Sequence, residues 1–210
     1  PRAPAAPPRQ STRPPLSAVP ELPLSEREAA LAKLAGQITE CGNCNLQFSR
    51  NLAIPGGGNP SADLVVILEL PTEQDDAAGA PAQGELGELL DNMLKAMGYA
   101  RQDVFLTHAV KCHPMGGRQA MEEEVAACRG LLERQLEIVR PRAILSLGQT
   151  GAMSLVPAAT REGMARVRGR WLDYRGVPFM TTFALGYIHR NRERKKVVWG
   201  DLQNVMKQLG

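Results

Sequence analysis

The stretch Leu64-Val65-Val66-Ile67-Leu68 decides the fold of this chain. Five consecutive apolar residues are typical of a strand that is buried on both faces, as in a parallel sheet covered by helices. Three further segments predict strands of the same sheet: Val104–Val110, Ala143–Leu147 and Pro178–Phe183. Helical patterns alternate with these strands at Ser25–Ile38, Glu85–Met97, Gln119–Val139 and Val197–Leu209. This alternation predicts an α/β fold with three layers, α/β/α, around a central, mostly parallel four-stranded sheet.

Length and charge narrow the class of protein. The 210 residues carry 25 Lys+Arg and 22 Asp+Glu, a net charge of +3, and 43% of them are hydrophobic. This length suits one domain of about 150–200 residues with a tail. No apolar run approaches the roughly 18 residues of a membrane span, so we expect a cytoplasmic protein without a membrane contact. The small net charge does not itself predict nucleic-acid binding, which must rest on local clusters.

Residues 1–24 differ in composition from the rest of the chain. They are rich in proline, alanine and serine, with almost no large apolar side chain. Such a segment cannot bury enough surface to offset its ordering entropy, so we expect a disordered arm, either a solvated tail or a partner-binding element. Ser25 and Glu28 have the spacing of a capping box, which predicts that an ordered domain spans residues 25–210.

The four cysteines are the strongest chemical signal that the residues themselves give. Cys41 and Cys44 form a C-x-x-C pair after the first predicted helix, and Cys112 and Cys128 follow far along the chain. In a cytosolic chain, metal ligands or core residues are more common than disulfides. The spacing leaves open a zinc site, a 4Fe–4S cluster, or unconnected cysteines of which Cys128 faces the core.

Several segments together resemble the family 4 uracil-DNA glycosylases, the iron–sulfur branch of their superfamily. The resemblance runs from about Leu34 to the C-terminus and rests on ordered motifs: Leu68-Glu69-Leu70-Pro71-Thr72, Gly79-Ala80-Pro81-Ala82-Gln83-Gly84, Leu106-Thr107-His108-Ala109-Val110-Lys111-Cys112-His113-Pro114, Leu147-Gly148, Arg168-Gly169 and Trp199-Gly200-Asp201-Leu202. It implies a uracil-DNA-glycosylase-like fold. It also implies a 4Fe–4S cluster bound by Cys41, Cys44, Cys112 and Cys128.

The same resemblance points to a pocket in which several family residues are replaced. Its positions in this chain are Glu69, Thr72, Ala82, His108 and Ala184. Ala82 stands where the family has a base-stacking Phe, and alanine offers no π-face. His108 replaces an Asn that reads the uracil edge, and Ala184 replaces a His that stabilises the departing anion. Thr72 replaces a Gly and would crowd the base. We therefore expect no catalytic residue and no uracil excision.

Two basic runs flank the last predicted strand. The side chains with a predicted contact to DNA are Arg168, Arg170, Arg190, Arg192 and Lys195. In the family both loops face DNA, although a charged run is more often a solvated surface.

Three functional hypotheses follow. The main one is a catalytically inactive interaction subunit of the psi type, linking the bacterial DNA polymerase III clamp loader to the chi subunit and single-strand binding protein. Its partners would be clamp-loader subunits and chi, bound through residues 1–24 and the folded domain. The alternative is a family 4 DNA glycosylase that excises uracil or another deaminated base with His108 as a divergent catalytic residue. The third is a DNA-binding repair scaffold without chemistry.

Overall fold

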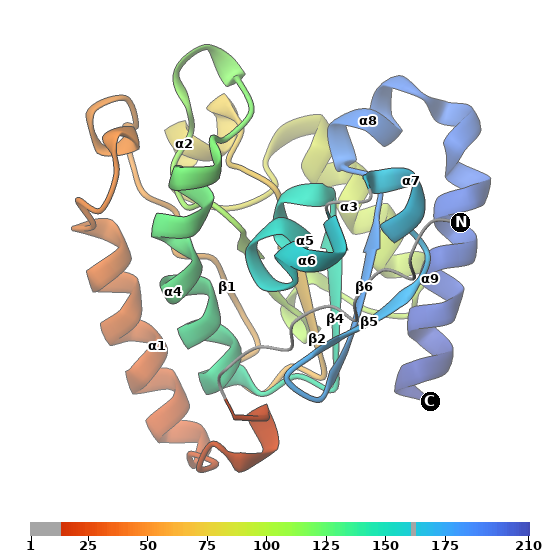
Figure 1. The fold of residues 1–210 in the computed structure, drawn as a ribbon, viewed down its shortest axis with the longest axis horizontal. Coiled ribbons are helices and arrows are strands. Elements are labelled where there is room, and N and C mark those ends of the chain that lie inside the picture. The colour runs from red at the N-terminus through yellow and green to blue at the C-terminus, as the bar shows by residue number, and fades with distance from the viewer. Residues whose placement is uncertain (1–13, 161–162) are drawn as a thin grey trace, which may run out of the picture.

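A computed structural model describes residues 14–160 and 163–210, and its centre is a six-stranded sheet in the order β1-β3-β2-β4-β6-β5 (Figure 1). The four inner strands are parallel: β3 (Phe105–His108), β2 (Leu64–Leu68), β4 (Ala143–Leu147) and β6 (Val177–Thr182). The two edge strands, β1 (Gly57–Gly58) and β5 (Trp171–Tyr174), pair antiparallel. The predicted α/β class and its four parallel strands are confirmed, and the edges extend the sheet to six strands.

Alternate residues of β2 face two different helix layers. Leu64, Val66 and Leu68 pack against α3 (Gly84–Ala96), α8 (Leu185–Arg190) and α9 (Lys195–Leu209). Val65 and Ile67 pack against α4 (Glu122–Val139) and α5 (Gln149–Leu155). Because both faces are covered, every residue of β2 is buried, as its continuous apolar run predicts.

The remaining helices lie around these layers. Figure 1 shows α1 (Leu24–Thr39) outside α4, at the opposite edge of the molecule from α9. The short helices are α2 (Glu73–Ala78), α6 (Pro157–Thr160) and α7 (Met164–Val167). Single 3₁₀ turns occur at Leu16–Ala18, Asn45–Phe48, Arg101–Asp103, Met115–Gly117 and Arg192–Arg194. In the described part of the chain, none of the helices has the length and hydropathy of a membrane span.

The first helix begins one residue before its predicted start. Pro23 is the N-cap residue, and its carbonyl accepts the first helical hydrogen bond from Arg27 N at 2.9 Å. No side chain caps this end, so the predicted capping box of Ser25 and Glu28 is wrong. Proline suits this position because it has no backbone N–H that would need a hydrogen-bond partner.

We expected a disordered arm over residues 1–24. The structure describes residues 14–24 of this segment, whereas residues 1–13 lie outside the described residues. Leu16 is buried in the core beside α4 and α5. Its N–H donates to the carbonyl of Arg175 at 2.9 Å, and Arg175 Nε donates to the carbonyl of Pro14 at 2.6 Å. One buried leucine and a buried guanidinium therefore order a segment whose overall composition is typical of disorder.

Leu16→Ala should lower the free energy of unfolding by about 2–5 kcal/mol, because it empties a fully buried site. Leu24→Ala is the matched control: Leu24 is 54% exposed, and its truncation should change stability by less than about 0.5 kcal/mol. Urea denaturation followed by circular dichroism measures both. Equal effects would mean that residues 14–16 do not dock as described.

Candidate functional site

A cleft of about 900 Å³ opens where the parallel strands end. All five predicted pocket positions line it: Glu69, Thr72, Ala82, His108 and Ala184. They come from the chain after β2, the last residue of β3, and the chain after β6. In open α/β sheets, ligands bind beyond the carboxyl ends of the strands, where neighbouring connections run in opposite directions. β2, between β3 and β4, marks that place here.

Asp75 holds one wall of the cleft together. Its buried carboxylate accepts hydrogen bonds from the backbone N–H of Thr72 at 2.9 Å and of Gln83 at 2.7 Å. The Thr72 hydroxyl accepts in turn from Asp75 N at 3.1 Å, which completes a capping box at the start of α2. Burial alone would raise the pKa of Asp75, but His108 and the two backbone donors together lower it. Thr72 therefore does more than crowd the cleft, since it caps the helix that carries Asp75.

His108 is the last residue of β3 and is completely buried. Its Nε2 lies 3.4 Å from Asp75 Oδ2, within ion-pair distance, yet neither ring nitrogen meets the geometry of a hydrogen bond to the described residues. Burial lowers the pKa of His108 below its ordinary value, against the opposing effect of Asp75. The imidazole is therefore neutral at pH 7, with one donor and one acceptor nitrogen.

Glu69 follows β2 directly and bends toward the end of β4. Its Oε1 accepts hydrogen bonds from Thr150 N at 3.2 Å and from Thr150 Oγ1 at 3.0 Å. A Cβ at Gly148 would lie 2.2 Å from the Glu69 side chain, and the φ of Gly148 is +115°. Glycine at position 148 thus allows the carboxylate to lie across the end of β4.

Ala82 and Ala184 add small apolar surfaces to the cleft. Ala82 is buried and has a positive φ of 54°, and its carbonyl accepts a hydrogen bond from Arg101 Nη2 at 3.0 Å. Ala184 is the N-cap residue of α8. Neither side chain can stack on a base or donate a hydrogen bond, as the sequence predicts.

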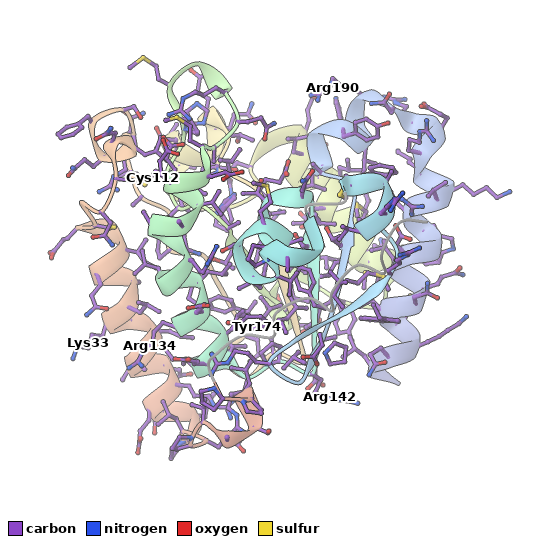
Figure 2. All side chains as sticks on the ribbon, viewed as in Figure 1. Lys33, Cys112, Arg134, Arg142, Tyr174 and Arg190 are labelled. Carbon is purple, nitrogen blue, oxygen red and sulfur yellow. The ribbon has the colours of Figure 1, made fainter. Side chains whose placement is uncertain are left out.

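The predicted DNA-binding residues fall into two groups. Arg170, Arg192 and Lys195 are exposed, and Arg190 is exposed at the rim of the cleft. Figure 2 shows Arg190 at the end of the molecule opposite Arg142, which precedes β4. Arg168 instead donates to both oxygens of Asp201, at 2.9 and 2.8 Å, and its guanidinium lies 5.3 Å from the ring centre of Phe183. The structure thus gives Arg168 an internal role that its charge does not indicate.

The cysteines lie beside the cleft, at the junction of α1, β3 and α4. Cys41 and Cys44 follow α1, Cys112 follows β3 and Cys128 lies on α4, and all four are free thiols. Burial is the main cause that raises the pKa of Cys128 to about 11, and nearby Cys112 and Cys44 contribute to this rise. Arg50 Nη1 donates to Cys112 Sγ at 3.0 Å, and Lys111 N lies 3.4 Å from Cys128 Sγ. Among the described residues, no three His, Cys, Asp or Glu side chains surround one point where a single metal ion could bind.

Comparison with known proteins places this site in a family. Residues 55–203 match the uracil DNA glycosylase superfamily. The chain belongs to this superfamily. It is 33% identical over 180 residues to a Type-4 uracil-DNA glycosylase of Thermotoga maritima, a match that covers 84% of this chain and 93% of the relative. The Type-4 uracil-DNA glycosylase of Saccharolobus solfataricus is 33% identical over 184 residues, covering 84% and 85%.

These superfamily relatives correct the main functional hypothesis. Relatives that match most of the chain are named Type-4 uracil-DNA glycosylase, so the expectation of an inactive psi-type subunit is wrong. The expected protein partners remain a prediction. That hypothesis rested on the replaced residues Ala82, His108 and Ala184 and gave too little weight to Glu69. A shorter match, 48% identical over 94 residues, is to a Type-5 uracil-DNA glycosylase of Pyrobaculum aerophilum and covers 45% of this chain and 41% of the relative.

Sequence reasoning missed three residues that position the site. Asp75 could have been found, because Thr72-Glu73-Gln74-Asp75 has the spacing of a capping box. Thr150 and Arg50 gave no local signal, since their partners Glu69 and Cys112 lie 81 and 62 residues away.

The stability of the protein should depend on His108 between pH 7 and pH 5. Because the pKa of His108 is lowered in the folded protein, the unfolded chain takes up a proton below about pH 6.5 that the folded chain resists. Wild-type protein should lose up to about 1.4 kcal/mol per pH unit more than His108→Asn over this range. His189→Asn, at a 38% exposed side chain, is the control and should follow the wild type. Urea unfolding at pH 5, 6 and 7 measures the slopes; parallel slopes for His108→Asn and wild type would contradict the buried neutral imidazole.

Proposed function

We propose that this chain is a DNA glycosylase that removes uracil or another deaminated base from DNA. The observation that carries the proposal is that a carboxylate, Glu69, and a buried neutral imidazole, His108, line one cleft beyond the ends of parallel strands. The Type-4 names of the relatives support the same class of reaction.

Glu69 is suited to the hydrolytic step. In that step a water oxygen bonds to the C1′ carbon of the deoxyribose, the bond between C1′ and the base nitrogen breaks, and the base leaves with the electron pair. Thr150 fixes Oε1 of Glu69 through two hydrogen bonds, which orients the carboxylate in the cleft. A carboxylate there can accept the proton of the water and stabilise positive charge that develops on the sugar.

His108 is suited to reading the base. The contact between Nε2 and the Asp75 carboxylate favours the tautomer with the proton on Nε2, which leaves Nδ1 as a hydrogen-bond acceptor. Deamination converts the unprotonated N3 of cytosine, or N1 of adenine, into a ring N–H. Nδ1 is buried without a hydrogen-bond partner among the described residues, so a base that displaces the atoms covering it would be favoured by this N–H and disfavoured by the lone pair of the normal base. His108 thereby supplies one polar contact in place of the two that an amide would make.

The four cysteines fit a 4Fe–4S cluster better than a single metal ion. Each cysteine of such a cluster binds a different iron, so the thiols surround a volume and need not converge on one point. Four free thiols, two from the segment after α1, one from the segment after β3 and one on α4, would provide these ligands, and Arg50 adds a hydrogen bond to Cys112 Sγ. When bound, the cluster would cross-link these segments through Cys41, Cys44, Cys112 and Cys128.

DNA is the partner that the surface around the cleft favours. Arg190 at the rim and the exposed Arg170, Arg192 and Lys195 can contact phosphates, which positions a duplex without reading its sequence. The expected cytoplasmic location remains a prediction.

Excision assays on DNA that contains uracil, hypoxanthine or xanthine test the proposed activity. Wild-type protein should release at least one of these bases, and Glu69→Gln should lower the single-turnover rate at least about 100-fold, because it removes the proton acceptor. His108→Ala should reduce the rate and the preference for the deaminated base over its parent. Glu88→Gln, an exposed change on α3, is the charge-matched control and should leave the rate unchanged. Release of none of the bases would overturn the proposal.

Protein purified without oxygen should be brown and contain about four irons per chain, if the cysteines bind the cluster. Cys112→Ser should remove the visible absorbance and lower the melting temperature, because cross-links between α1 and the segment after β3 are lost. Iron analysis, absorbance and calorimetry provide the measurements. Colourless protein with one zinc per chain would contradict the cluster.

A further inference from the structure

Arg50 follows the C-x-x-C pair and reaches back to the cysteines. Its Nη1 donates to Cys112 Sγ at 3.0 Å. Its Nη2 donates to the carbonyl of Cys41 at 2.8 Å and to the carbonyl of Thr39, the last residue of α1, at 3.2 Å. One guanidinium thus joins the segment after α1 to the segment after β3, and both segments would supply ligands to the proposed 4Fe–4S cluster.

The backbone on both sides of Arg50 is anchored to the rest of the protein. The N–H of Arg50 donates to the carbonyl of Leu46 at 3.1 Å, and the Leu46 side chain is buried in the core. The N–H groups of the next two residues, Asn51 and Leu52, donate to the buried carboxylate of Asp76 at distances of 2.9 to 3.2 Å. The backbone contacts of the segment therefore direct the guanidinium toward the cysteines.

Burial makes charge compensation important at this place. Cys112 and Cys128 are 3% and 4% exposed. A 4Fe–4S cluster with four thiolate ligands is an anion, and it gains one further negative charge when it accepts an electron. Burial of such a charge is unfavourable unless charged or hydrogen-bonding groups compensate for it. A guanidinium supplies both a positive charge and a directed N–H, and hydrogen bonds with an ionised partner are the stronger kind.

Lys111 is a second basic residue beside the cysteines, but its amine is engaged elsewhere. The three N–H groups of the amine donate to two side chains and to one carbonyl oxygen of the protein. Toward the cysteines, Lys111 offers its backbone N–H, which donates to Cys128 Sγ at 3.4 Å. Arg50, by contrast, directs its charged group at a sulfur.

We infer that Arg50 is a positioning residue for the proposed cluster: it holds Cys112 in place as a ligand and raises the reduction potential of the cluster. This role rests on the proposed function, of which the cluster is a part. Net charge and hydrogen bonds to the sulfurs are among the factors that set the potential of an iron–sulfur cluster. Because the reduced cluster carries more negative charge than the oxidised one, a guanidinium at Cys112 Sγ stabilises the reduced form more strongly.

Potentiometry of the full-length protein, purified without oxygen and reduced stepwise with dithionite, tests this role. In Arg50→Gln, the ratio of reduced to oxidised cluster at a fixed potential should fall about tenfold, which shifts the midpoint by about 59 mV toward more negative values for one electron. Arg50→Lys keeps the positive charge but not the planar fork, so its midpoint should lie closer to the wild type than that of Arg50→Gln.

Arg134→Gln is the matched control. Arg134 lies on α4, as Cys128 does, and its side chain is 68% exposed. Figure 2 shows Arg134 apart from Cys112. Its substitution removes the same charge as Arg50→Gln and should leave the midpoint unchanged, because the lost charge is far from the sulfurs and screened by water.

Release of iron to EDTA gives a second readout, which needs no electron transfer. Arg50→Gln should lose iron several-fold faster than the wild type and Arg134→Gln, because Cys112 is no longer tied to the segment after α1. If Arg50→Gln binds no iron at all, the iron content of Arg50→Lys decides. A full complement of iron in the lysine variant supports the role of the positive charge, and loss of iron from both variants overturns it.

The results also separate this role from the glycosylase activity. An Arg50→Gln midpoint equal to that of the wild type, or more positive, would overturn the role of Arg50 alone if the wild type excises a base. Colourless wild-type protein would overturn the cluster and this role together, and excision by that protein would still support the glycosylase. An Arg50-dependent midpoint in protein that excises no base would overturn the glycosylase proposal and leave the role of Arg50 supported.

Discussion

Parallel pairing of β2 with β3 and β4 is the constraint on which the cleft depends. Leu68 pairs with His108 on one side and with Leu147 on the other, and Leu147 pairs with Thr182 of β6. The strands therefore end at one level, so that Glu69 and His108 line the same cleft although 39 positions separate them in the sequence. A shift of one residue in β2 would turn its side chains to the opposite helix layers, and burial on both faces resists such a shift.

Asp75 links backbone geometry to the proposed base-reading residue. One buried carboxylate caps α2, fixes the N–H of Gln83 and faces His108. The backbone donors satisfy its negative charge, so the carboxylate can remain ionised beside a neutral imidazole. Its two oxygens are largely occupied by structural bonds, and Asp75 therefore orients His108 more than it acts on a substrate.

The parts of the fold that could be predicted from the sequence are those in which burial requires apolar residues. The four buried parallel strands are visible in the sequence as apolar runs. In contrast, β1 consists of two glycines and β5 mostly faces solvent, so neither has an apolar pattern that predicts a strand. The resemblance predicted the lining of the cleft, since motif order is local. Interactions between distant segments were not predictable. The composition around Leu16 did not indicate that this side chain is buried, and the charge of Arg168 did not indicate its ion pair with Asp201. The inactive interpretation failed for a related reason, because absent residues were counted without the geometry of those that remain.

The chain from His108 to Arg118 runs from the proposed base-reading residue through Cys112, a proposed cluster ligand, to the lining of the cleft. Its turn is locked by Lys111, whose buried Nζ donates to Thr107 Oγ1 at 2.6 Å, Gln135 Oε1 at 2.6 Å and the carbonyl of His108 at 2.7 Å. Burial removes water from the Lys111 amine and lowers its pKa to about 7. The three acceptors take the place of water and hold the amine in position. A cluster bound through Cys112 would fix the next residue of the same turn. The same three hydrogen bonds fix the position of His108, because its carbonyl oxygen is one of the acceptors of the Lys111 amine.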